Sequence, residues 1–197
     1  MQPAATRTVN LTVRPLTSDT WDDFETVMGA NGGARGCWCM HWRLSIEEWM
    51  EGKGDGNKAA MRNLAARETP PGVVAYLDDE PIAWCGFGDR SEFPRMQRSS
   101  LLKPIDDEPV ISVTCLFVKK GHRGEGLSSE LIVAVCDYLA ETAEAPTVEA
   151  YPVEPAAGRR AGADNAMTGI ASAFRAAGFT EIARPRRDRP VMRYSLR

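Results

Sequence analysis

The chain has 197 residues, of which 43% are hydrophobic and 26% are charged, a composition that suits one domain with a full core over residues 1–197. Its formal net charge of −3 and its isoelectric point near 5.5 argue against general affinity for nucleic acid or for an anionic membrane. No apolar run approaches the ~20 residues of a membrane span, and the first ten residues lack the apolar core of a signal peptide. We therefore expect a cytoplasmic protein.

The chain begins with a lead, residues 1–8, that we expect to be flexible. Residues 11–16 then predict a first strand that is ended by a proline. Ser18 or Asp19 can cap the helix that follows, whose apolar residues share one side and which stops at Gly29.

Two shorter helices and a hairpin are expected next. Residues 45–48 have the form of a capping box and predict the start of a helix. Asn57 is expected to cap a further helix over residues 57–68. Residues 73–77 and 81–87 predict two strands around a tight acidic turn, which favours an antiparallel hairpin.

A long connection, residues 88–109, leads to the second half of the chain. A run rich in β-branched and aromatic residues predicts a strand there, and apolar residues at helical spacing follow it. The elements expected in this half are a strand at 110–118, a helix at 127–139, a strand at 147–153, a helix at 164–177, and a hairpin of strands at 179–183 and 191–196.

The turn after the strand at 110–118 has the composition of an anion site. It leads into a helix, whose first backbone N–H groups lack partners and carry the positive end of the helix dipole. Gly124 and Gly126 allow positive φ and close approach of a ligand, and His122, Arg123 and Ser128 add donors. The turn matches neither GxxxxGK[ST] nor a GxGxxG that follows a strand. We therefore expect a phosphorylated ligand here.

The string RGEGLS at residues 123–128, with LFV at 116–118 before it, resembles the R/Q-x-x-G-x-G/A signature of the GCN5-related N-acetyltransferase (GNAT) family. Ser128 replaces the usual glycine or alanine at the last position. The resemblance implies that the turn binds the pyrophosphate of acetyl-coenzyme A and that the strand before it pairs with the pantetheine arm. The cofactor-binding residues that it implies are Leu116, Phe117, Val118, His122, Arg123, Gly124, Glu125, Gly126, Leu127, Ser128 and Phe174.

The order of elements, β-αα-βββ-α-β-α-ββ, is similar to the GNAT fold along nearly the whole chain. It implies an α/β fold with a mixed, mostly antiparallel central sheet and helices on both faces. The closing string AFRAAGF at residues 173–179 also resembles the ending of the family. Phe174 stands where the family often has a tyrosine that acts as general acid, and Met167 replaces an asparagine. Tyr151, on the fifth strand, or an ordered water is the candidate acid in its place.

The reaction that the resemblance implies is direct attack of an amine on the acetyl thioester, which requires a neutral amine and a donor that polarises the carbonyl. Some family members use a carboxylate on the fourth strand as base, but residues 110–118 contain none. Asp107 and Glu108 precede this strand and, with His41, are the candidates for a base that acts through water. The alternative is that both carboxylates are ordinary solvated loop residues.

The string GCWCMHWR at residues 36–43 has three interpretations. Two thiols and an imidazole suggest zinc, but a tetrahedral site needs further ligands and the chain has only one other histidine, so we expect no metal. The stretch can also be a buried hydrophobic plug, since Cys, Trp and Met are often buried. In the resembling family, the segment after the first helix borders the acceptor site. Trp38, Met40, His41 and Trp42 would then line a substrate pocket.

We therefore expect an enzyme that moves an acetyl group from acetyl-coenzyme A to a primary amine. The acceptor can be a small amine, an antibiotic, a peptide N-terminus or a lysine, and assembly as a homodimer stays open. One alternative is a coenzyme A or acyl-coenzyme A binding module without catalysis, because the tyrosine and the carboxylate are missing. Another is a thiol or zinc sensor built on Cys37 and Cys39. The five cysteines are an odd number spread along the chain, which favours reduced thiols over a disulfide framework.

Overall fold

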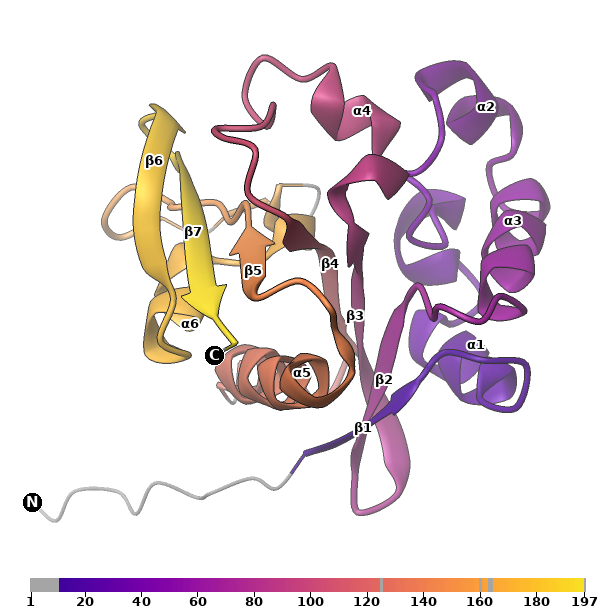
Figure 1. The fold of residues 1–197 in the computed structure, drawn as a ribbon. Helices are drawn as coiled ribbons and strands as arrows, with labels where there is room; N and C mark the ends of the chain where they lie inside the picture. The colour runs from indigo at the N-terminus through magenta and orange to yellow at the C-terminus, as the bar shows by residue number, and fades with distance from the viewer. Residues whose placement is uncertain (1–10, 125, 160, 163–164, 197) are drawn as a thin grey trace, which may run out of the picture.

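A computed structural model describes residues 11–124, 126–159, 161–162 and 165–196 (Figure 1). The expected flexible lead, residues 1–8, lies outside this part of the chain. The strands are β1 (Thr12–Pro15), β2 (Gly72–Leu77), β3 (Glu80–Asp89), β4 (Val110–Val118), β5 (Thr147–Ala150), β6 (Thr180–Arg186) and β7 (Arg189–Ser195). They form one seven-stranded sheet in the order β1-β2-β3-β4-β5-β7-β6. Among the strands of the described residues, β4 and β5 run parallel and each other neighbouring pair is antiparallel. The predicted mixed, mostly antiparallel sheet is confirmed.

Helices cover both faces of the sheet, because both faces of β2 are apolar. Val73 and Ala75 belong to a core cluster with α5 (Leu127–Thr142) and α6 (Ala171–Ala176). Val74 and Tyr76, which alternate with them, face a second cluster. That cluster contains residues of α1 (Trp21–Met28) and α3 (Asp55–Ala65), with α2 (Ile46–Glu51) beside them. Figure 1 shows α5 and α6 on one side of the strands and α1, α2 and α3 on the other.

The strands β4 and β5 are paired only along the first half of β4. Residues 110–113 of β4 pair with β5, but residues 114–118 have only β3 as a paired neighbour within the described part of the chain. β5 ends at Ala150, three residues earlier than predicted, and the chain later returns as the short 3₁₀ helix η3 (Ala166–Thr168), which lies against β4. The second half of β4 therefore has an edge on which no strand lies.

The last predicted helix is interrupted for a visible reason. Instead of one helix over 164–177, η3 is followed by Gly169 at φ 85°, then Ile170 in an extended conformation, and then α6. A Cβ atom at Gly169 would lie 2.6 Å from the Phe174 ring and 2.7 Å from the Leu116 side chain. Close packing of the chain at this glycine breaks the helix.

The predicted start of the helix at residue 127 is confirmed, but only one of the predicted side-chain caps is. The capping box at Ser45 is confirmed, since the Glu48 N–H donates to Ser45 Oγ at 3.2 Å and the Ser45 N–H donates to Glu48 Oε2 at 2.9 Å. The caps predicted at Ser18 or Asp19 were wrong: α1 begins after Thr20 with no side-chain cap. Asn57 was also wrong as a cap.

Asn57 lies inside α3, which ends at Ala65 and not at residue 68, and its side chain is fully buried. Its Nδ2 donates to the carbonyl of Gly36 at 3.0 Å and to that of Trp49 at 3.2 Å. The asparagine therefore ties the segment after α1 to α2.

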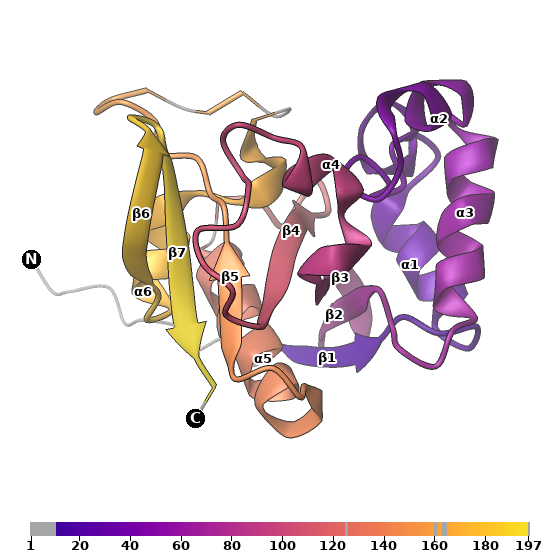
Figure 2. The ribbon, with the colours of Figure 1, turned by 45° about the horizontal axis from the view of Figure 1, so that its top comes forward.

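The connection from β3 to β4 contains structure that the sequence did not predict. It forms a 3₁₀ turn, η2 (Arg90–Glu92), and the short helix α4 (Pro94–Gln97). Figure 2 shows α4 near the ends of β3 and β4, on the side of α2. Within the described residues, no helix is long and apolar enough to cross a membrane.

Candidate functional site

A cavity of about 720 Å³ opens beside the free half of β4. Three parts of the chain line it: the end of β4 with the basic turn after it, the segment between α1 and α2, and the junction of η3 with α6. The cavity therefore joins the predicted anion site to a strand edge that still has backbone groups to offer a ligand.

The predicted cofactor residues gather on one wall of this cavity. Its lining includes Leu116, Phe117, Val118, His122, Arg123, Gly124, Gly126, Leu127 and Ser128. Glu125 lies outside the described residues. Phe174 is fully buried and packs behind Gly169, so it supports the wall and is not part of the lining.

The backbone of the basic turn has the conformation that its glycines suggested. Gly124 has φ 90° and Gly126 has φ 79°, both in the region that glycine adopts without strain. Gly126 is the N-cap of α5, and no side chain caps this helix end. The first-turn amides of α5 therefore face a position where a phosphate can replace the missing cap.

Arg123 is held across the end of β4. Its Nε donates to the Val118 carbonyl at 2.7 Å, and its guanidinium carbon lies 5.2 Å from the centre of the Phe117 ring. His122 lies on the other side of the turn, with Nε2 3.7 Å from a carboxylate oxygen of Glu80. The turn thus carries two nitrogen-bearing side chains at the rim of the cavity.

Of the four residues predicted for the substrate pocket, His41 alone is in the lining of this cavity. Met40 is buried in the core cluster against α1 and α3. Trp42 packs against the smaller cluster that contains Phe93 and Met96. Trp38 stacks on Trp21 with ring centres 6.4 Å apart.

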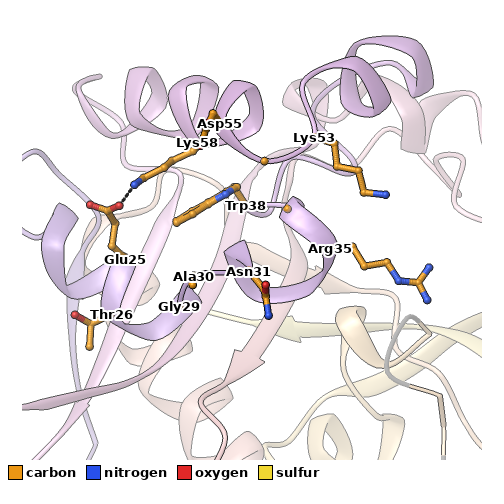
Figure 3. A pocket seen from close by; sticks show the side chains of 12 residues that line it. Glu25, Thr26, Gly29, Ala30, Asn31, Arg35, Trp38, Lys53, Asp55 and Lys58 are labelled. Carbon is orange, nitrogen blue, oxygen red and sulfur yellow. Dashed lines mark ion pairs between the residues drawn. The ribbon is translucent and has the colours of Figure 1, made fainter.

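The outer edge of Trp38 borders a different hollow, of about 770 Å³, between α1 and α3. In Figure 3 its indole lies beside the ion pair of Glu25 and Lys58, and the Lys58 ammonium is 5.2 Å from the ring centre. Arg35 and Lys53 lie at the other end of this hollow (Figure 3). Trp38 is therefore fixed from both sides.

The three predicted catalytic residues lie outside the cavity lining. Tyr151 is buried, and its hydroxyl donates to Glu149 Oε1 at 2.5 Å and lies 2.9 Å from Ser112 Oγ. Burial and the neighbouring Glu149 carboxylate raise the pKa of the Tyr151 phenol. Glu108 is paired with Arg193 at 2.7 Å, and Asp107 is exposed before β4. None of the three lies in the cavity wall, and the side chains of Tyr151 and Glu108 have partners elsewhere.

His41 is held neutral at physiological pH by its surroundings. Arg95 Nη1 lies 3.3 Å from His41 Nδ1 and donates to the His41 carbonyl at 2.6 Å. The rings of Trp42 and Trp49 meet the imidazole edge-on at 4.7 and 5.2 Å. Burial, with the Arg95 charge as a second cause, lowers the pKa of His41 to about 4. A neutral imidazole of this kind is a weak base.

This lowered pKa predicts a pH dependence of stability. In the unfolded chain His41 takes up a proton near its ordinary pKa of ~6.5, whereas in the folded protein it does so only near pH 4. Acidification therefore favours the unfolded state within that window, and the free energy of unfolding should fall as the pH drops from about 6.5 to about 4. His41→Gln should make this fall shallower in urea unfolding curves measured across the window. Parallel curves for the two proteins would contradict the assigned environment.

Three thiols also lie in the cavity wall, those of Cys37, Cys39 and Cys115. All five cysteines of the chain are free. Among the described residues, no group of three or more His, Cys, Asp or Glu side chains is placed to hold a metal ion.

Several lining residues were missed from the sequence. Cys115 was assigned only to a strand and Met28 only to one side of a helix, and Trp49 was not singled out. The junction at residues 166–170 was assigned to a continuous helix. Only Cys115 carried a local signal, because it directly precedes the strand residues that were assigned to the pantetheine arm.

Three comparisons with known proteins bear on this arrangement. A model of the acetyltransferase (GNAT) family matches residues 38–160. Among curated protein sequences there is no match.

Solved structures share the fold at low sequence identity. The aminoglycoside acetyltransferase AAC(6')-Ib in complex with coenzyme A and kanamycin has a TM-score of 0.53 and 14% identity, over 94% of this chain and 95% of that one. An uncharacterized protein from Bacillus halodurans gives 0.57 and 15%, over 97% and 86%. The PaiA N-acetyltransferase of Thermoplasma acidophilum in complex with coenzyme A gives 0.51 and 13%, over 94% and 99%.

The mixed α/β fold that these solved structures share has, in this chain, central strands that separate beside a glycine-rich basic turn. The family match covers more than half of the residues and includes β4 and the turn. The chain belongs to the GNAT acetyltransferase family.

Proposed function

We propose that this protein transfers an acetyl group from acetyl-coenzyme A to a primary amine by direct attack of the amine on the thioester. The observation that carries the proposal is the continuity of one cavity from the uncapped N-terminus of α5, along the free half of β4, to the segment after α1.

In this proposal the cofactor has one orientation in the cavity. Its pyrophosphate belongs at Gly124 and Gly126, where backbone amides and the dipole of α5 favour an anion. The pantetheine arm, which carries amide groups, then runs along residues 116–118, where β4 has no second strand partner. The thioester comes to lie near Cys115, and a β4 amide there can polarise its carbonyl.

The acceptor amine belongs in the remaining part of the cavity, beyond the thioester. This part is lined by Met28, Cys37, His41 and Trp49, an aromatic and sulfur-rich wall. In this proposal His41 is a wall residue, because its lowered pKa makes it a weak base. Tyr151, Asp107 and Glu108 have no role in proton transfer. The thiol of coenzyme A, with a pKa near the ~8.5 of cysteine, leaves without a dedicated acid.

The experiment is a thiol-release assay with acetyl-coenzyme A and a panel of primary amines. The panel should contain kanamycin, a lysine peptide, peptides with different N-terminal residues and small aromatic amines, with product masses as a second readout. An alkylamine has a pKa near ~10.4, so turnover should rise with pH up to that range when no strong base assists.

Two outcomes contradict the proposal. Binding of acetyl-coenzyme A with no amine-dependent release across the panel would favour a binding module without catalysis. A pH profile that is flat from about pH 6 to 10 would show that amine deprotonation does not limit the reaction.

A further inference from the structure

The backbone around Cys39 is strained in a way that places its side chain. Trp38 and Cys39 have φ values of 46° and 59°, and neither is a glycine. Consecutive left-handed residues persist only where their surroundings over-determine them, and such strain concentrates at functional sites. Here Trp38 is fixed by packing against Trp21 and Phe24, whose ring centres lie 6.4 and 6.0 Å from the ring centre of Trp38. With the indole of Trp38 fixed in this way, the side chain of the next residue, Cys39, lies against β3.

The sulfur of Cys39 is seated against β3 at a position that requires glycine. A Cβ atom at Gly86 would lie only 2.7 Å from Cys39 Sγ, 3.2 Å from Trp84 Nε1 and 3.4 Å from Cys115 Cβ. Gly86 is paired with Cys115 across β3 and β4. The missing side chain at residue 86 thus makes room for a thiol, with an indole N–H and a second thiol around it.

The groups around Cys39 favour its thiolate form. The neighbouring Cys115 thiol, the Trp84 N–H and the Arg43 charge all act to lower its pKa. Trp84 Nε1 is buried and has no well-formed hydrogen bond within the described part of the chain, so its N–H remains available for a negative charge. These groups outweigh burial and lower the pKa of Cys39, whereas the pKa values of Cys37, Cys85 and Cys115 are raised. Of the three thiols in the cavity wall, Cys39 combines a position beside the buried, unpartnered Trp84 N–H with a lowered pKa.

Cys39 is also within the cavity that receives the cofactor in the proposed function. Both Cys39 and Cys115 are in its lining, and Cys115 adjoins Leu116, where the pantetheine arm begins its run along β4. The thiolate therefore lies on the wall that the thioester reaches.

We infer that Cys39 is itself an acyl acceptor and takes the acetyl group from bound acetyl-coenzyme A when no amine is present. This inference rests on the proposed function, because it needs the cofactor in this cavity. The Cys39 sulfur forms a bond to the acetyl carbon, the carbonyl polarised by the β4 amide passes through a tetrahedral adduct, and the bond to the sulfur of coenzyme A breaks. The products are S-acetyl-Cys39 and coenzyme A thiolate, which takes up the proton that Cys39 gives up on reaching its thiolate form. One thioester replaces another, so the exchange needs no further reactant.

The test uses the wild-type protein with acetyl-coenzyme A alone. After an acid quench, intact mass should show one added acetyl group, peptide mapping should place it on Cys39, and neutral hydroxylamine should remove it, as expected for a thioester. Cys39→Ser should lose the modification. Cys136→Ser is the matched control, because Cys136 is buried on α5 and burial raises its pKa to about 12. This variant should still be acetylated at Cys39, as the wild type is.

A second variant tests the surroundings of the sulfur without removing it. Trp84→Phe keeps an aromatic ring and deletes the N–H, so acetylation of Cys39 should slow at least severalfold while calorimetry shows unchanged affinity for acetyl-coenzyme A. An unchanged rate in Trp84→Phe would overturn the arrangement.

Two further results would overturn the inference and separate it from the proposed function. Acetylation at Cys37 or Cys115, or no acetylation although calorimetry shows bound acetyl-coenzyme A, would overturn the role of Cys39 and leave the proposed function standing. Failure to bind acetyl-coenzyme A at all would overturn both.

Discussion

Gly126→Val should weaken the binding of coenzyme A by at least about tenfold, which corresponds to about 1.4 kcal/mol. Gly126 has φ 79° and forms the N-cap of α5, where the pyrophosphate would meet the helix amides. A branched side chain there is strained and occupies the space that the phosphates need. Among the described residues, apart from Gly126, its chain neighbours and the nearby helix backbone, no atom lies within 4 Å of the new Cβ position, so the effect should fall on the ligand. Calorimetric titration with coenzyme A measures it.

Gly29→Val is the matched control for this variant. Gly29 also has positive φ, 64°, and lies at the end of α1; apart from its chain neighbours, no described atom lies within 4 Å of a Cβ there. Its ψ of −179° is restricted to glycine more strictly than the αL conformation of Gly126, so Gly29→Val should carry at least as much backbone strain, visible in thermal melts, with wild-type affinity for coenzyme A. Equal losses of affinity in the two variants, or none in Gly126→Val while it remains folded, would remove the turn from the cofactor site.

The predicted cofactor residues that the structure brings to one cavity wall are those whose placement depends on neighbouring residues. The strand pattern of β4 and the glycines after it determine the local backbone, so the wall formed by residues 116–128 follows from one stretch of chain. The capping box at Ser45 succeeded for the same reason.

The other wall depends on contacts between segments that are distant in sequence. The left-handed conformation of Trp38 and Cys39 follows from packing against Trp21, and the seat of the Cys39 sulfur depends on Gly86. Neither is visible in the string that contains the cysteines. His41 shows the same dependence, since Arg95, 54 residues away, determines the environment of its ring.

Tyr151, which the sequence suggested as a candidate acid, has hydrogen-bond partners that no sequence pattern could show. Its hydroxyl contacts Glu149 on β5, Ser112 on β4 and Arg90 in η2. The last of these contacts spans 61 residues of sequence. A sequence pattern gives the type of side chain, whereas its partners come from the sheet order and the β3 to β4 connection.

The second large effect is expected at the centre of that network. Glu149→Gln should lower the free energy of unfolding by about 3–5 kcal/mol, the range for removing one partner of a buried ion pair. The Glu149 side chain is 1% exposed and lies between two arginines whose side chains are 13% and 12% exposed, Arg90 and Arg193. Arg193 Nε donates to it at 2.8 Å, and Tyr151 donates at 2.5 Å. Without the charge, Arg90 keeps its desolvation cost and loses its carboxylate partner, and Arg193 keeps only the more exposed Asp106 and Glu108.

Glu181→Gln provides a control with the same two-arginine pattern at the surface. Glu181 pairs with Arg184 at 2.5 Å and Arg175 at 3.5 Å, but its side chain is 32% exposed. Surface pairs contribute about 0–1 kcal/mol, so this variant should unfold within that margin of the wild type in guanidinium chloride.

Arg90 also donates to the Leu102 carbonyl and so fixes the connection that carries Arg95. Glu149→Gln should therefore destabilise this connection, whose Arg95 contacts His41, as well as the sheet, with faster amide hydrogen exchange over residues 90–103. If Glu149→Gln and Glu181→Gln change stability equally, the buried network does not hold this connection in place.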